Sequence, residues 1–422
     1  MGLCRPARNL RVVVRRPLVP LWRARTGLWS SDRAQTLTAL AVNSTTSLVA
    51  GVFLGALTGT FERLPGLLVL VPAAIGLRGN VFSALGSRLS TSVHAGTFSL
   101  SRRRGTVVVE NVIGALLLTS GVSLVLAGGA WLLAGVVLAT PPIPLLQLAT
   151  VSVAGGLLAS TVVLAVTIGL AVLAAERGWD LDNLVAPVVS TMGDVLTLPA
   201  LWLATLLLDH GASSTVVGWF LVAVAAAGSV YGVATRRPLL ASVCRQSWPI
   251  LVAAGGLSLL AGLVIEHRLA AFTEAPALLI LVPAFVSSAG ALGGILAARV
   301  ATGLHLGTRL GGLAPDRDTR DDARTIALLA LPVMVYNATG ARAVAGLVGP
   351  AAPPLWDLLV TTLLAGTGAV AFAIVVAYLS SVAAVRLRLD PDTYGIPVVT
   401  SSVDLVGAVL LTGTAVALGV VA

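Results

Sequence analysis

The stretch from Asp180 to Asp194, D-L-D-N-L-V-A-P-V-V-S-T-M-G-D, carries one carboxylate into an apolar run that continues to Leu208. The same layout recurs from Asp390 to Asp404 as D-P-D-T-Y-G-I-P-V-V-T-S-S-V-D, at an offset of 210 residues. A carboxylate in the middle of a membrane is costly unless it faces a protein interior or a water-filled path. Its recurrence at a matched position predicts that Asp194 and Asp404 form a functional pair.

The composition is that of a membrane protein. Of the 422 residues, 57% are hydrophobic and 11% are charged, whereas soluble domains carry about 25% charged residues. A helix needs about 20 apolar residues to cross a bilayer. Eleven segments meet this requirement: 36–58, 65–93, 107–139, 146–175, 184–208, 215–234, 249–268, 275–300, 324–348, 355–384 and 395–421. We therefore expect an all-α polytopic membrane protein.

The arginines indicate the orientation in the membrane. The net charge is +9, and 21 of the 27 basic residues, all arginines, precede the first span or fall in alternate loops. The positive-inside rule assigns these segments to the cytoplasm. We expect a cytoplasmic N-terminus, an external C-terminus, residence in the plasma membrane and no nucleic-acid partner. The arginine-rich, acid-poor first 35 residues are also typical of an organellar transit peptide, a less economical alternative.

The chain is an internal duplication. Residues 65–97 align without gaps with residues 276–308, at an offset of 211. Identical pairs include Pro72/Pro283, Gly79/Gly290, Arg88/Arg299, Thr91/Thr302 and His94/His305. Each repeat holds five spans, an odd number, so two directly joined repeats would face opposite ways in the membrane. The unmatched sixth span, 215–234, restores the direction, and the two repeats run parallel. The expected organisation is a basic arm (1–35), a first repeat (36–210), a linking helix (211–240) and a second repeat (241–422), working as a monomer with an internal pseudo-dimer.

Two carboxylates at one depth without a matched basic partner predict a cation site. Asp194 lies ten residues into its span, about 15 Å from the cytoplasmic edge at 1.5 Å per residue. The alternative is a structural ion pair with Arg78 or Arg342. The repeat argues against it, because the equivalent positions in the other half hold Ala289 and Trp131.

Hydroxyl groups and glycines near the carboxylates are candidate pore-lining groups. Hydroxyls three or four residues before each carboxylate share its helical face, but they can also bond to carbonyls of their own helix. Pro187 and Pro397 are expected in the first helical turn. Glycine-rich segments in the second helix of each repeat can unwind it and expose carbonyl oxygens, or permit close helix packing. The candidates are Gly76, Gly79, Asn80, Gly290, Ser190, Thr191, Thr400 and Ser401.

Acidic and amide side chains gather at the expected cytoplasmic ends of these helices. They would concentrate cations at the mouth of a pathway, or cap the helices that follow them. These residues are Asp180, Asp182, Asn183, Asp390, Asp392 and Glu110.

Three motifs together carry a resemblance to a known family: P-x-x-x-G-x-x-G-N (Pro72 to Asn80), R-L-S-T (from Arg88), and the D-x-D-N…P…G-D stretch that ends at Asp194. The chain resembles the MgtE-type magnesium transporters, and most of all the fused, solute carrier family 41-like form in which two five-helix units share one chain.

The resemblance implies transport of Mg²⁺, or of Mn²⁺ or Co²⁺, through a pore between the two units. It implies Asp194 and Asp404 as the metal ligands, no organic cofactor and no enzymatic activity. Mg²⁺ keeps several waters and binds through one or two carboxylates, which suits such a pair. The second half departs from the motifs, since Ala291 replaces the asparagine and Val403 replaces the glycine before Asp404.

Two other functions share some of these features. A cation-coupled carrier of a small solute would also need intramembrane carboxylates. An intramembrane aspartyl protease would need the run G-x-G-D, and the chain has T-M-G-D and S-S-V-D at these positions.

Overall fold

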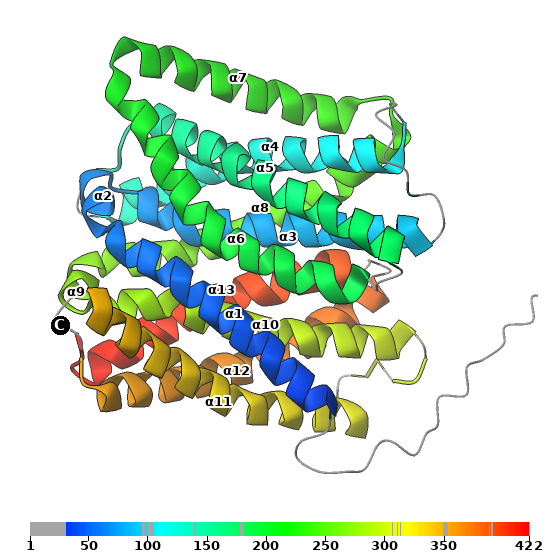
Figure 1. Ribbon diagram of the computed structural model, residues 1–422, viewed down its shortest axis with the longest axis vertical. Coiled ribbons are helices and arrows are strands. Elements are labelled where there is room, and N and C mark those ends of the chain that lie inside the picture. Colours follow the sequence, from blue (N-terminus) through cyan, green and yellow to red (C-terminus); the bar gives the residue numbers. More distant parts are fainter. Residues whose placement is uncertain are drawn as a thin grey trace, which may run out of the picture.

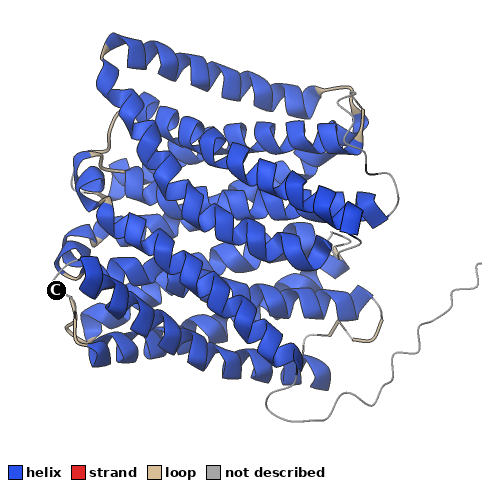
Figure 2. Cartoon of the chain, in the orientation of Figure 1, coloured by secondary structure: helices blue, strands red, loops and turns tan. Residues whose placement is uncertain are grey.

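The structure, a computed structural model, describes residues 31–94, 98, 105–138, 141–177, 181–305, 307–309, 311–312, 314–348, 353–387, 389 and 391–421. This part of the chain is helical and contains no strand (Figure 2). Eleven of its helices are long and apolar enough to cross a membrane. The expected all-α polytopic membrane fold is confirmed.

The helices follow the same order in both halves of the chain (Figure 1). The first half contains α1 (Ser31–Ala56), α2 (Thr58–Arg63), α3 (Leu67–His94), α4 (Val107–Val137), α5 (Leu145–Arg177) and α6 (Leu181–Thr205). A 3₁₀ turn (Leu206–His210) and α7 (Ala212–Ala234) follow. The second half contains α8 (Pro238–His267), α9 (Leu269–Glu274), α10 (Pro276–His305), α11 (Arg317–Val348), α12 (Leu355–Arg386) and α13 (Pro391–Ala417).

The repeat extends to the short helices α2 and α9, which hydropathy alone did not predict. The residue that ends each of them has the same backbone conformation, with φ −125° and ψ 70° at Leu64 and φ −126° and ψ 70° at Ala275. Figure 1 shows α2 and α9 at the same end of the bundle. The two halves therefore run in the same direction.

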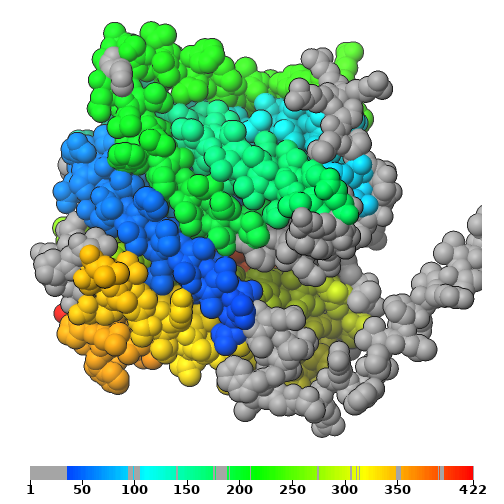
Figure 3. All heavy atoms as spheres, in the orientation of Figure 1, coloured from blue at the N-terminus to red at the C-terminus, as the bar shows by residue number. Residues whose placement is uncertain are grey.

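The first long helix of each half packs against the second long helix of the other half. Thus α1 contacts α10, and α8 contacts α3. A Cβ atom on Gly51 of α1 would lie 2.0 Å from the carbonyl oxygen of Ile280, and one on Gly262 of α8 would lie 2.1 Å from that of Val69. Both crossings therefore require glycine, because any side chain would collide with backbone. In Figure 3, α1 runs along the boundary between the two halves.

The degree of burial separates the central helices from the linking helix. In their most apolar stretches, 61% of the residues of α3 and 67% of those of α10 are buried, against 17% in α7. Helix α7 packs on α4 and α5 through Gly218, Ala225 and Gly232, which are spaced seven residues apart. Its remaining surface is apolar and faces outward, at the edge of the molecule in Figure 1.

Several helices begin before the apolar run that predicted them. Helix α8 begins at Pro238 rather than at residue 249. Helices α6 and α13 begin at Leu181 and Pro391, so Pro187 and Pro397 are the seventh residues of their helices. The prediction that these two prolines lie in the first turn was wrong, because the helices extend beyond their apolar segments into polar sequence.

Candidate functional site

Asp194 lies where three helices meet. It belongs to α6 and is 7% exposed. The hydroxyl of Ser47, from α1, donates a hydrogen bond to its Oδ2 atom over 2.7 Å. The hydroxyl of Ser287, from α10, donates to the same oxygen over 3.1 Å. The carboxylate is therefore held by side chains from both halves of the chain.

Asp404 lies at the equivalent junction. It belongs to α13 and is half-buried. The hydroxyl of Ser258, from α8, donates a hydrogen bond to its Oδ2 atom over 2.9 Å. A Cβ atom on Gly76, from α3, would lie 3.8 Å from the same oxygen. This carboxylate also faces elements from both halves.

The two environments are related by the duplication. At the offset of 211 residues, Ser47 matches Ser258 and Gly76 matches Ser287. Each carboxylate thus contacts the first long helix of its own half and the second long helix of the other half. The pair thus lies at the interface of the two halves.

The first junction is more polar than the second. Asn43 of α1 donates through Nδ2 to the hydroxyl of Ser287 over 3.1 Å. At the second junction, the residues that match Asn43 and Ser287 are Ala254 and Gly76, which offer no side-chain donor. Asp194 therefore has a small hydrogen-bonded network, whereas Asp404 has a single hydroxyl donor among the described residues.

Neither carboxylate forms an ion pair within the described part of the chain. The ion pairs there are Arg237–Glu110, Arg299–Asp322, Arg309–Asp322 and Arg324–Asp321. Arg78 is fully buried, and its Nη1 donates to the carbonyl oxygen of Ala74. No described residue accepts a hydrogen bond from its Nε or Nη2 atom. The alternative of a structural ion pair with Arg78 or Arg342 is therefore not supported.

Comparison with known proteins identifies the family of the chain. The family model for MgtE, described as a divalent cation transporter, matches residues 71–204 and 282–414. The chain belongs to the MgtE family. Each matched segment contains one of the two intramembrane aspartates, and the two matches correspond to the two halves of the chain. This family consists of transporters rather than enzymes.

Among curated relatives, solute carrier family 41 member 2 from Gallus gallus is 28% identical over 260 residues, which is 58% of this chain and 44% of that protein. Its Homo sapiens counterpart is 27% identical over 270 residues, 61% of this chain and 45% of that protein. The match thus spans less than half of the member 2 proteins. Member 3 from Mus musculus is 27% identical over 405 residues, 86% of this chain and 79% of that protein. No solved structure shows a significant match.

The glycine-rich segments of this MgtE-family protein do not interrupt its helices. Helices α3 and α10 are continuous, so of the two alternatives for these segments, unwinding is not supported. The absence of a side chain at these glycines allows close packing instead. Gly76 lies against Asp404, and a Cβ atom on Gly290 would lie 3.8 Å from Thr400. A Cβ atom on Gly79 would have no neighbour within 4 Å among the described residues, so Gly79 borders open space.

The predicted pore-lining polar groups differ in their surroundings. The hydroxyl of Thr400 donates to the carbonyl oxygens of Ile396 and Pro397 over 3.1 and 3.3 Å, which is the back-bonding alternative. Ser401 is buried, and Thr191 and Asn80 are half-buried. A pore-lining role for these groups stays a prediction.

Most of the predicted cytoplasmic mouth lies outside the described residues. This applies to all atoms of Asp180 and Asp390, and to the side chains of Asp182, Asn183, Asp392 and the pore candidate Ser190. Glu110 is described. It accepts a hydrogen bond from the amide of Gly105 over 2.9 Å and pairs with Arg237 at 3.4 Å. Glu110 therefore ties the start of α4 to the residue that precedes α8.

The structure adds Ser47, Ser258, Ser287 and Asn43 to the site. The signal for the first two was present in the sequence, because they are identical at the offset of 211 residues. The aligned blocks began at residue 65 and did not reach the first helix of each half. In the described part of the chain, no three histidine, cysteine or acidic side chains converge. The site is therefore a pair of separate carboxylates rather than a metal cage.

Proposed function

We propose that this chain transports a divalent cation, Mg²⁺ in the first place, along a path between its two halves, with Asp194 and Asp404 as intramembrane ligands. The observation that carries this proposal is the matched pair of junctions. Each presents one carboxylate at the interface of the repeats, and neither carboxylate has a basic partner among the described residues.

The energetics of the two carboxylates favour a cation. An intramembrane carboxylate costs about 3 kcal/mol or more. A hydrogen bond to a charged group returns about 1.5–3 kcal/mol, and Asp404 receives one such bond from the described residues. Part of the cost therefore remains for a bound cation to offset. Two carboxylates carry a charge of −2, which a single divalent ion neutralises.

The ligand chemistry favours a hard, partly hydrated ion. In both junctions the hydroxyl donors bind Oδ2, and no donor from the described residues reaches Oδ1 of either carboxylate. Each Oδ1 atom is thus available to a cation or to one of its waters. Mg²⁺ binds proteins through one or two carboxylates and retained waters. Mn²⁺ and Co²⁺ are the competing substrates to test, and the proposed site requires no organic cofactor.

The proposal includes an orientation and an assembly. The arginine distribution supports a cytoplasmic N-terminus and an external C-terminus, and we propose the plasma membrane as the location. The two halves provide both junctions within one chain, so we propose that the monomer is the transporting unit. The proposed segments are the arm 1–35, the first repeat 36–210, the linking helix 211–240 and the second repeat 241–422.

The decisive experiment measures Mg²⁺ uptake by purified protein in liposomes loaded with a magnesium dye. We expect Asp194→Asn and Asp404→Asn each to abolish most of the uptake. Asp209→Asn removes an exposed carboxylate beyond α6 and serves as the matched control, with uptake unchanged. Uptake that survives in the Asp194→Asn, Asp404→Asn double variant refutes the site. Flux of a small solute driven by a cation gradient, without net Mg²⁺ uptake, would instead favour the coupled carrier.

A further inference from the structure

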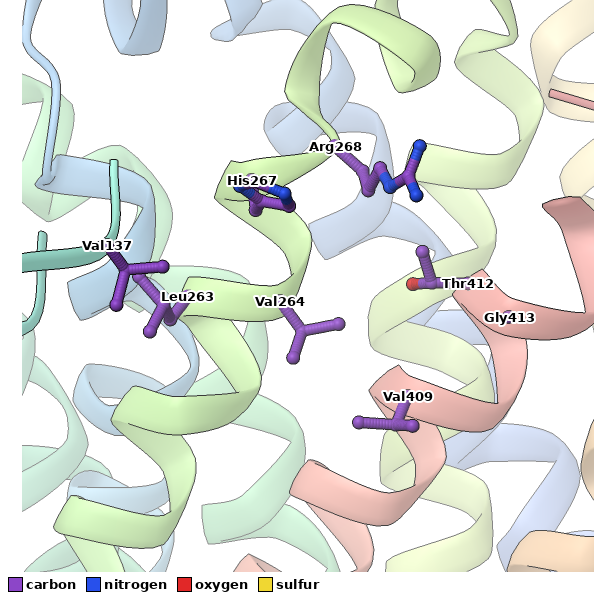
Figure 4. Close-up of a pocket in the computed structure, with 8 residues that line it drawn as sticks. All are labelled: Val137, Leu263, Val264, His267, Arg268, Val409, Thr412 and Gly413. Carbon is purple, nitrogen blue, oxygen red and sulfur yellow. The ribbon is translucent and has the colours of Figure 1, made fainter. Parts of the chain in front are cut away.

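A groove on the outer surface of the second half is separate from the two aspartates. It lies between the ends of α8 and α13, beside the end of α4, and has a volume of about 300 Å³. Val264 of α8 and Val409 of α13 line it, and Thr412 and Gly413 of α13 contribute the remaining α13 surface. Figure 4 shows these side chains together with His267 and Arg268 at one end of the groove. The groove is thus aliphatic along its length and basic at one end.

The duplication supplies an internal comparison for this groove. The residues that match Thr412 and Gly413 in the first half are Trp202 and Leu203. The residue that matches Val264 is Phe53. Trp202, Leu203 and Phe53 are partly exposed, so bulky side chains stand on the surface there. The second half therefore has less side-chain volume at every one of these positions.

The same comparison holds for the basic end. His267 and Arg268 match Ala56 and Leu57 in the first half. His267 and Arg268 are both exposed at the end of α8. No acidic side chain is among the described residues that line the groove. Smaller side chains at Val264, Thr412 and Gly413 and the two basic side chains thus occur together, on one of two surfaces that the duplication relates.

We propose that this groove binds an anionic phospholipid, with an acyl chain along the aliphatic walls and the phosphate at Arg268 and His267. Arginine pairs with phosphate oxygens through two parallel hydrogen bonds. Basic pockets between transmembrane helices on the cytoplasmic side of membranes bind anionic headgroups, and the same chemistry is available to a basic group at the other face. The groove lies at the end of the bundle that carries α2 and α9 (Figure 1), which the proposed orientation makes the external end. The lipid would come from that leaflet.

The test uses native mass spectrometry of the full chain, equilibrated with phosphatidylglycerol or with phosphatidylcholine of the same acyl chains. We expect the unmodified protein to retain phosphatidylglycerol several-fold more than phosphatidylcholine. Arg268→Leu introduces the residue of the first half and is expected to remove this preference. Arg63→Leu removes another exposed arginine from the same end of the molecule, outside the groove, and is expected to leave it intact.

A second variant tests the acyl-chain part of the groove. Thr412→Trp with Gly413→Leu installs the side chains of the first half, and we expect it to lose retention of both lipids. Retention of phosphatidylglycerol by this filled variant would overturn the proposal, because the phosphate would then bind without the groove. Equal retention of the two lipids by the unmodified protein, or equal losses in Arg268→Leu and Arg63→Leu, would overturn it as well. A protein dimer that forms through this surface, with no lipid bound there, would also overturn the proposal. If the filled variant does not fold, Arg268→Leu, at an exposed position, decides the question.

Discussion

Ser47 and Ser258 make the same hydrogen bond in the two halves of the chain: each donates its hydroxyl to Oδ2 of the aspartate in the last helix of its own half. The surroundings of these two bonds differ. On the first carboxylate a second donor, Ser287, binds the same oxygen, whereas the equivalent position on the second is Gly76. The duplication has thus kept one contact and changed the other, and this difference can be tested.

We expect Ser258→Ala to impair transport more than Ser47→Ala. Asp404 loses its one donor among the described residues, whereas Asp194 keeps Ser287. Loss of a hydrogen bond to a charged group is worth about 1.5 kcal/mol or more, or about tenfold in uptake at subsaturating Mg²⁺. The measurement is initial uptake in liposomes. Thr46→Val is the control, because the acceptors of the Thr46 hydroxyl among the described residues are carbonyls of α1. A larger effect of Ser47→Ala would contradict the assigned roles.

A serine introduced at position 76 should rescue the Ser258→Ala variant. A Cβ atom on Gly76 has room, at 3.6 Å from the Ser258 hydroxyl and 3.8 Å from Oδ2 of Asp404. Its hydroxyl would take the place that Ser287 has beside Asp194. We expect Gly76→Ser to restore most of the uptake. Gly76→Ala, in the same background, adds the methyl group without a donor and should not. Equal behaviour of the two double variants would show that the donor is unimportant.

Gly262→Ala should destabilise the protein strongly, because its Cβ atom would lie 2.1 Å from the carbonyl oxygen of Val69. Forcing the two backbones apart costs about 1–3 kcal/mol or more. Gly256→Ala is a control in the same helix, since a Cβ atom there has no neighbour within 4 Å among the described residues. It should be neutral or stabilise by up to about 1 kcal/mol through helix propensity. Thermal unfolding in detergent compares the two variants, and equal melting temperatures would refute the close crossing.

Arg78→Met should leave the stability unchanged or raise it. The guanidinium of Arg78 is fully buried, and Ala74 provides its one hydrogen-bond acceptor among the described residues. Burying an unpaired charge is costly, and methionine fills a similar volume without that cost. Breaking a buried ion pair would instead lose about 3–5 kcal/mol. Thermal unfolding distinguishes the two results, and a loss of that size would show that Arg78 has an acidic partner.

Much of the architecture could be predicted from hydropathy and self-similarity. The eleven spans are long apolar runs, and the repeat pairs Asp194 with Asp404 by simple alignment. The helix starts could not be predicted in the same way, since α8 includes Arg245 and other polar residues before its apolar run. Hydropathy locates the part of a helix that lies in the membrane, not the part that extends beyond it.

The donors to the carboxylates were only partly predictable. The identity of Ser47 and Ser258 is visible in the sequence, but the contact of Ser287 with Asp194 depends on the packing of α1 against α10. The packing of the first long helix of one half on the second long helix of the other half is a tertiary feature. No local sequence pattern in either half predicts it. For the same reason, the sequence could not decide whether the glycine-rich segments unwind their helices or allow close packing, and the structure shows close packing at Gly76 and Gly290.

The crossing of α1 over α10 also has a consequence for biosynthesis. Gly51 and Ile280, which touch at that crossing, are separated by more than 200 residues of chain. During translation α1 is therefore synthesised long before its partner α10. Until α10 is inserted, the surface of α1 that contacts it has no partner from α10. A nascent chain that ends before Ser287 has only part of the first junction, and it lacks Asp404 of the second. The proposed cation path needs both aspartates, so it is complete only after Asp404, close to the end of the sequence, has been synthesised.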